Sequence, residues 1–150
     1  MDIICLPFNK LSLDQLYAVM RLRQEVFVVE QDCPYLDADG KDQESEHLMI
    51  FEKGELVAYT RLVPPGISYI NYSSIGRVVN SKKFRGEGLG KKLMEQSIQE
   101  CLRLFPNHPI KISAQCYLEK FYKELGFKDL GSRYDEDGIP HMGMIFNKAN

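Results

Sequence analysis

The sequence lacks three features, and each absence excludes a common class of protein. No stretch approaches the roughly 20 apolar residues of a membrane helix, and the first residues lack the basic start of a secretory signal, so we expect a cytoplasmic protein without a membrane partner. The net charge is −2, which argues against a nucleic-acid partner because phosphate backbones are bound by basic surfaces. No Cys-x-x-Cys pair is present, so we expect four reduced thiols and neither a zinc site nor a redox motif.

The length and composition indicate one globular domain. A chain of 150 residues buries roughly 70% of its unfolded surface on folding, which is enough for one ordinary core. Hydrophobic residues make up 44% of the sequence and charged residues 27%, both close to the average of soluble domains. Because no repeat or linker interrupts the chain, we predict that residues 1–150 form a single domain.

Hydrophobic periodicity predicts an alternation of strands and helices. A capping box of Ser12 and Gln15 begins the first helix. Further helices are expected at 89–105 and 118–125, and strands at 2–8, 47–52, 55–63, 74–80, 110–114, from 127 onward and at about 141–147. An early hairpin followed by strand-helix-strand units predicts an α/β (α+β) fold, with a single mixed, mostly antiparallel sheet of six to seven strands and helices on both faces.

The most informative segment is residues 85–91, Arg-Gly-Glu-Gly-Leu-Gly-Lys, between a predicted strand and a predicted helix. Glycines let the backbone approach an anion closely, and the unpaired amides of the first helical turn donate to it. The spacing of Gly86, Gly88 and Gly90 is neither the Gly-x-Gly-x-x-Gly of a dinucleotide site nor the longer spacing of a P-loop. We therefore predict a phosphate-binding turn of another type. A site for NAD or a nucleotide sugar is the less favoured hypothesis.

Two motifs resemble those of the GNAT family of N-acetyltransferases. Arg85, Gly88 and Gly90 match its Arg-x-x-Gly-x-Gly turn, which binds the pyrophosphate of acetyl-CoA, and residues 118–127 resemble its later motif, with Tyr122 at the tyrosine position. Residues 23–31, the Glu-His-Leu at 46–48 and residues 138–144 resemble the ElaA-type branch of that family. The resemblance covers nearly the whole chain and implies a GNAT-like acyl-CoA N-acyltransferase fold, acetyl-CoA as the acyl donor and, by analogy, a homodimer.

The resemblance also implies roles for particular residues. The backbone around Val78 and Val79 would pair with the pantetheine arm as an added strand. Tyr122 would protonate the departing thiolate, since the reference pKa is about 8.5 for a thiol and about 10 for tyrosine. The implied cofactor-binding residues are Val78, Val79, Arg85, Gly86, Glu87, Gly88, Leu89, Gly90 and Lys91.

The base that deprotonates an amine acceptor stays open at this point. An alkylammonium with a pKa near 10.4 needs such a base at neutral pH. The sequence offers Glu44, Glu46, His47 and His141, and a chain of waters is a further alternative.

Seven carboxylates lie between residues 30 and 46, where hydrophobic periodicity disappears. We expect a long loop that either attracts a cationic acceptor or is solvated. It does not match a calcium-binding EF-hand, because Gly40 is the fourth residue from Asp37 rather than the sixth, and we predict no metal site.

These observations predict an enzyme that transfers an acetyl group directly from acetyl-CoA to a primary amine of a small molecule or peptide. The alternative is an acyl-CoA-binding module without catalysis, in which the same turn holds the cofactor. The sequence does not identify the acceptor.

Overall fold

Seven strands form two antiparallel sheets in the computed structural model, which describes residues 1–148. One sheet has the order β1 (Asp2–Pro7), β2 (Glu46–Glu52), β3 (Glu55–Val63), β4 (Ser74–Asn80), and the other has the order β5 (Ile110–Gln115), β7 (Ile139–Phe146), β6 (Lys128–Glu136). The helices are α1 (Leu13–Arg23), α2 (Leu89–Leu104), α3 (Glu119–Glu124) and the π-helical η2 (Gln24–Glu30), with short 3-10 turns η1 (Phe8–Lys10), η3 (Asp42–Glu44), η4 (Lys82–Phe84) and η5 (Cys116–Leu118).

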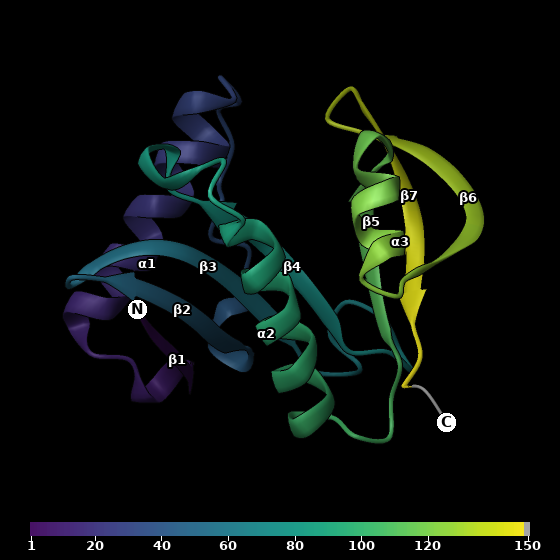
Figure 1. Ribbon diagram of the computed structural model, residues 1–150, viewed down its shortest axis with the longest axis horizontal. Coiled ribbons are helices and arrows are strands. Elements are labelled where there is room, and N and C mark those ends of the chain that lie inside the picture. The colour runs from purple at the N-terminus through teal and green to yellow at the C-terminus, as the bar shows by residue number, and fades with distance from the viewer. Residues whose placement is uncertain (149–150) are drawn as a thin grey trace.

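The division into two sheets differs from the single sheet expected from the sequence. The sheets meet where Ser73 forms a parallel bridge with Ile110, and the amide of Lys111 donates to the carbonyl of Ser73 at 2.8 Å. From that point β4 and β5 diverge (Figure 1). The register of β3 and β4 shifts between Tyr59 and Arg61, which places an extra residue in β4. Such a bulge bends a strand, and this accounts for the separation.

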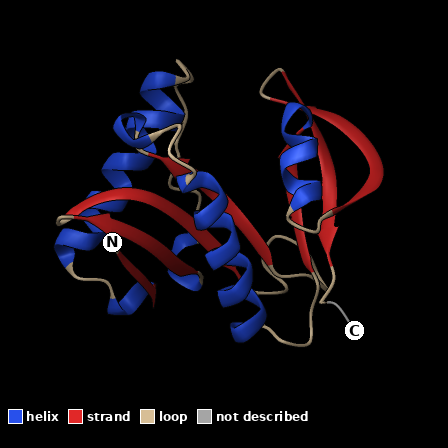
Figure 2. Cartoon of the chain, viewed as in Figure 1, coloured by secondary structure: helices blue, strands red, loops and turns tan. Residues whose placement is uncertain are grey.

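Helices cover both faces of the four-stranded sheet, as predicted (Figure 2). On one face Val19 and Leu22 of α1 belong to the same buried cluster as Met49 and Tyr59. On the opposite face Leu93 of α2 packs among buried residues of β2 and β3. A third cluster joins α2 and α3 to the three-stranded sheet, so the hydrophobic core continues beneath the divergence of the two sheets.

Local sequence signals explain where several elements begin and end. The hydroxyl oxygen of Ser12 accepts from the amide of Gln15 at 3.0 Å, and the Gln15 side chain accepts from the amide of Ser12 at 2.8 Å, which confirms the predicted capping box. Lys53 and Gly54 both have positive φ, at 50° and 81°, as a tight hairpin turn requires. Within residues 1–148, no helix combines the length and apolar character needed to cross a membrane.

Candidate active site

A cavity of about 410 Å³ lies where β4 and β5 diverge. Residues 75–80 of β4 form one wall, and Ile112, Ser113 and Gln115 of β5 contribute to the other. The remaining lining comes from η2 and the loop after it, from Arg85 of the glycine-rich turn, from Met94 of α2, from η5 and α3, and from the β6–β7 hairpin. A cavity of this size between two secondary-structure layers is typical of a small-molecule site.

The glycine-rich turn lies at one end of β4 and leads into α2. Gly86 and Gly88 have φ of 88° and 73°, a left-handed conformation that other residues adopt at a cost, and Gly88 precedes the first residue of α2. No side chain of residues 1–148 caps this helix, and the amide of Lys92 makes a long helical bond of 3.3 Å to the carbonyl of Gly88. The amides before Lys92 are therefore available to an anion.

The predicted cofactor residues occupy different places around this turn. The cavity lining includes Val78, Val79 and Arg85. Leu89 is a core residue with 6% exposure, and Gly90 lies so close to β4 that an added Cβ would meet the side-chain nitrogen of Asn80 at 3.3 Å. The members that lie outside the lining of this cavity are Gly86, Glu87, Gly88, Leu89, Gly90 and Lys91.

Arg85 is held by an ion pair that the sequence did not predict. Its two terminal nitrogens donate to the two carboxylate oxygens of Glu30 at 2.6 and 2.9 Å, and one also donates to the carbonyl of Asn80 at 3.3 Å. The hydrogen bonds from Arg85 lower the pKa of Glu30. The pair connects the end of η2 to the glycine-rich turn across 55 residues of sequence.

Tyr122 is placed by α3 with its ring buried and its residue in the cavity lining. The ring contacts Phe121 and Phe127 edge-on, at centroid distances of 5.2 and 5.7 Å. Burial, and then the charge of Tyr117, raises the pKa of Tyr122 to about 12. Among residues 1–148 no side-chain hydrogen bond engages its hydroxyl, so the proton is available to a ligand.

His141 is the base candidate that the structure brings to the cavity. It lies on β7 with 6% exposure, its Nδ1 is 2.7 Å from the carbonyl oxygen of Ile139, and its ring stacks on Tyr134. A carbonyl accepts only, so Nδ1 carries the proton in the neutral ring and Nε2 carries the lone pair. Nε2 is 3.4 Å from a carboxylate oxygen of Glu136, which also lines the cavity. Two acceptors thus converge where a donor such as an amine would fit.

The other base candidates lie elsewhere. His47 is fully buried, with Nδ1 2.6 Å from the hydroxyl of Tyr59 and Nε2 2.9 Å from the carbonyl of Asp42, and burial lowers its pKa. Burial raises the pKa of Glu46, and the charges that act on it come from α2. Neither residue lines the cavity, nor does Glu44. These positions argue against all three as the base.

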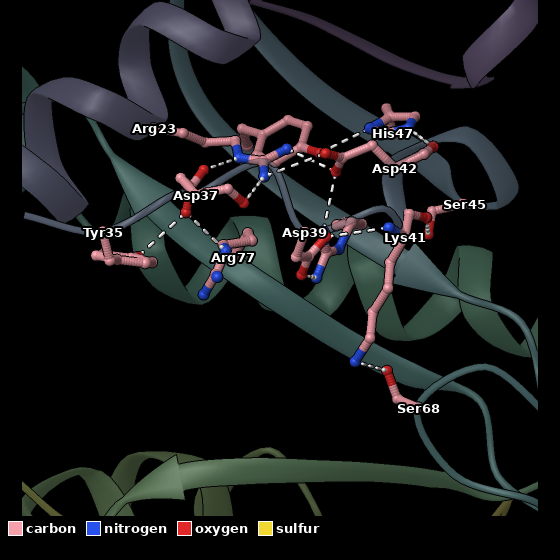
Figure 3. Close-up of polar contacts among 12 residues, drawn as sticks. Arg23, Tyr35, Asp37, Asp39, Lys41, Asp42, Ser45, His47, Ser68 and Arg77 are labelled. Atoms are coloured by element: carbon pink, nitrogen blue, oxygen red, sulfur yellow. Dashed lines mark hydrogen bonds and ion pairs between the residues drawn. The ribbon is translucent and has the colours of Figure 1, made fainter. Parts of the chain in front are cut away.

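Three carboxylates of the acidic loop, Asp37, Asp39 and Asp42, are bound by arginines and are not free to attract a cation, which corrects the sequence interpretation for them (Figure 3). Asp32 and Glu44 of the same segment are exposed. Arg23, with no exposed surface, donates to Asp37 at 2.5 Å and to Asp42 at 2.7 Å. Arg61 donates to Asp42 at 2.9 Å and to both carboxylate oxygens of Asp39, at 2.8 and 2.9 Å. These three carboxylates therefore neutralise buried arginines of α1 and β3.

Sequence reasoning also missed Arg77 and Glu136 as cavity residues. Arg77 directly precedes the two valines assigned to the cofactor, and Glu136 precedes the Asp-Gly turn that pairs β6 with β7. The available signals were the position of Arg77 next to a predicted motif and that of Glu136 across a predicted hairpin from His141. Which way the two side chains point depends on the bulge in β4 and on the register of β6.

The fold is the one found in acyl-CoA N-acyltransferases. A crystal structure of an acyl-CoA N-acyltransferase from Pseudomonas aeruginosa matches with a TM-score of 0.92 and 44% identity, over 97% of this chain and 99% of that chain. That of Escherichia coli ElaA matches with a TM-score of 0.90 and 39% identity, over the same shares.

In sequence, the family model for the acetyltransferase (GNAT) domain matches residues 16–148. The chain therefore belongs to the GNAT acetyltransferase family, as the two motifs indicated. In sequence, a UPF0039 protein of Synechocystis is 49% identical over 140 residues, 93% of this chain and 90% of that protein. Escherichia coli ElaA is 42% identical over 141 residues, 93% and 92% of the two chains, which confirms the similarity to the ElaA-type branch.

The arginine-aspartate network predicts a large effect of substitution at its centre. Asp42→Asn removes the carboxylate charge that both Arg23 and Arg61 contact, so the free energy of unfolding should fall by about 3 kcal/mol or more. Urea denaturation measures this change. Glu55→Gln, which breaks an exposed pair with Lys83, is the control and should cost less than about 1 kcal/mol. Equal effects of the two substitutions would contradict a stabilising role for the network.

Asp39 predicts an acid dependence of stability. Burial would raise its pKa, but hydrogen bonds from Arg61 and the amide of Lys41 outweigh burial and lower the pKa to about 2. The folded pKa is then below the unfolded value of about 3.9, so the contribution is present above about pH 4 and is lost as the pH falls toward 2. Between about pH 5 and 3, unfolding free energy should fall more steeply for the wild type than for Asp39→Asn, and parallel curves would contradict the assignment.

Proposed function

We propose that this protein is an acetyl-CoA-dependent N-acetyltransferase that acts on a primary amine. The observation that carries the proposal is the cavity between β4 and β5, which combines an unpaired strand edge, the free hydroxyl of a largely buried tyrosine and a histidine-carboxylate pair. Proteins of this fold bind acyl-CoA, and a CoA-dependent acyl-homoserine lactone synthase that shares the fold (TM-score 0.78, 18% identity) has been solved with isopentyl-CoA.

The donor site follows from the backbone. Past Ser73, β4 pairs with β3 on one side only, so the other edge carries amides and carbonyls for the pantetheine arm to pair with. The glycine-rich turn and the first amides of α2 receive the pyrophosphate. Arg85 adds positive charge there, and its bond to Glu30 is the contact with which the phosphate competes.

The chemistry uses two residues of the cavity. Nε2 of His141 accepts a proton from the bound ammonium, and the carboxylate of Glu136 holds the cationic form beside it. The amine nitrogen then attacks the thioester carbonyl carbon, and amides of β4 stabilise the resulting oxyanion. When the carbon-sulfur bond breaks, Tyr122 gives its proton to the thiolate, and the attacking nitrogen loses its remaining extra proton as the amide forms, which restores the neutral tyrosine. The raised pKa of Tyr122 keeps its hydroxyl protonated until this step.

The role of Tyr122 is tested by Tyr122→Phe. Because its hydroxyl makes no side-chain hydrogen bond within residues 1–148, the change should leave packing intact while lowering kcat by about a hundredfold or more. Thiol release measures turnover, and calorimetry should show CoA affinity within about twofold of the wild type. Tyr17→Phe, at an exposed position of α1, is the control. A parallel loss of CoA affinity would assign Tyr122 a structural role instead.

The phosphate site is tested by Gly88→Glu. The added carboxylate would face the pyrophosphate, and like charges at such a contact should weaken CoA binding by about a hundredfold or more. Gly66→Glu is a matched control, since Gly66 has φ of 95° and, like Gly88, no atom within 4 Å of an added Cβ. Both variants carry the same charge and comparable backbone strain. Unchanged CoA affinity in Gly88→Glu would refute the assignment of the turn.

The remaining candidate function is an acyl-CoA-binding module without catalysis. Assays of wild-type protein with acetyl-CoA and a panel of primary amines separate the two functions. Release of free thiol that depends on an amine supports the transferase. CoA binding without turnover of any amine would favour the binding module.

A further inference from the structure

Arg77 is an unusual residue in the cavity wall. It occupies the bulge of β4 with φ of 50°, a left-handed conformation that glycine or asparagine adopts at lower cost. Its side chain is 26% exposed and lines the cavity. An arginine in this conformation suggests that the side chain serves the site, and its surroundings indicate how.

The guanidinium of Arg77 is fixed in place. Its central carbon lies 5.4 Å from the ring centroid of Phe27 and 5.9 Å from that of Tyr35, and its Nε lies 2.9 Å from a carboxylate oxygen of Asp37. Aromatic faces and a carboxylate both favour a cation at this position. These contacts preorganise Arg77, which lowers the entropic cost of binding a ligand.

The hydrogen-bonding capacity of Arg77 is nevertheless unused. Within residues 1–148 its side chain makes no hydrogen bond, and the buried Nε lacks a partner of suitable geometry although Asp37 is near. Asp37 instead accepts hydrogen bonds from Arg23 and Tyr35. Figure 3 shows the terminal nitrogens of Arg77 extending away from Asp37. Two terminal nitrogens in a rigid fork are suited to a carboxylate or a phosphate.

The opposite wall of the cavity carries the opposite charge. Arg77 belongs to the four-stranded sheet, whereas Glu136, Asp137 and His141 belong to the β6–β7 hairpin of the three-stranded sheet. A ligand between them meets a cation on one side and carboxylates with an imidazole on the other. This distribution complements a molecule that carries both a positive and a negative group.

We propose that the acceptor is a small amine that also bears an anionic group, a carboxylate or a phosphate, and that Arg77 binds this group. The inference rests on the proposed function, because it assigns the ammonium to Glu136 and His141. A cavity of about 410 Å³ shared with the end of the pantetheine arm limits the acceptor to a small molecule. Arg77 thereby determines specificity and positions the amine for attack.

The test uses matched pairs of acceptors. 4-Aminobutyrate is compared with butylamine, and O-phosphoethanolamine with ethanolamine, by thiol release from acetyl-CoA. The wild type should show a higher kcat/KM for the anionic member of at least one pair, and the pair that responds identifies carboxylate or phosphate. In Arg77→Gln the ratio of anionic to neutral kcat/KM should fall by about tenfold to a hundredfold, the size expected for a lost charge-assisted hydrogen bond.

Arg77→Lys is the conservative variant. It keeps the charge but loses the fork, so its ratio should lie between those of the wild type and Arg77→Gln. The ratio separates recognition from structure, since a general disturbance of β4 lowers turnover of both members alike. An unchanged ratio in Arg77→Gln, or a wild-type preference for the neutral members, would overturn the proposal.

Failure of the proposed function gives a different result. If CoA binds but no amine is turned over, binding of 4-aminobutyrate and O-phosphoethanolamine to the CoA complex is measured by NMR titration of the wild type and Arg77→Gln. Weaker binding to the variant supports recognition by Arg77 in a protein that is not a transferase. Equal binding, or none to either protein, rejects it.

Discussion

The separation of β4 from β5 is the structural constraint on which the rest of the site depends. In a continuous sheet the two strands would pair along their length, and no backbone amide or carbonyl would be left for a ligand. Here pairing stops after the bridge between Ser73 and Ile110, and the bulge at Arg77 turns β4 away. The same bulge thus opens the strand edge, creates the cavity and points an arginine into it.

The two diverging sheets are held in position by different interactions on the two sides of the cavity. Beneath the cavity, Met94 of α2 and Tyr122 of α3 belong to a hydrophobic cluster that spans both sheets. On the other side, Asp37 and Asp42 bind Arg23, which fastens the loop after η2 to α1. Buried ion pairs add little net stability compared with apolar packing, but they define position because each charge needs its particular partner. This network therefore fixes the position of the loop that contributes Tyr35 to the cavity wall.

The sequence predicted those parts of the molecule that depend on local patterns. The capping box at Ser12, the bounds of β4 and the start of α2 at Leu89 all follow from short-range periodicity and turn residues, and the structure confirms them. The strand count was correct as well. The division into two sheets was missed, because it follows from a one-residue bulge at Arg77, and the neighbouring Gly76, an isolated glycine within a strand, was not interpreted as a sign of that bulge.

The candidate site was predictable only in part, for the same physical reason. The glycine-rich turn could be recognised in the sequence because the phosphate binding proposed for it needs the backbone alone. The base could not be identified in the sequence, since His47 and His141 look alike there and differ only in the residues that surround them after folding. The carboxylates of the acidic loop were misinterpreted because their arginine partners are 14 to 22 residues away. Arg61, a charged residue within the apolar run of β3, was the visible sign that a buried counter-charge is required.

One short segment connects the two ends of the cavity. η2 is wound with five-residue hydrogen bonds at its end, from Gln31 to Val26 and from Cys33 to Val28, and such π-helical turns are frequent at functional sites. It carries Phe27, which lies against the guanidinium of Arg77, and Glu30, which binds Arg85 of the glycine-rich turn. Under the proposed function, a pyrophosphate that competed with Glu30 for Arg85 would act on the same helix that contacts Arg77 on the proposed acceptor side. The proposed donor and acceptor halves of the cavity thus share one structural element.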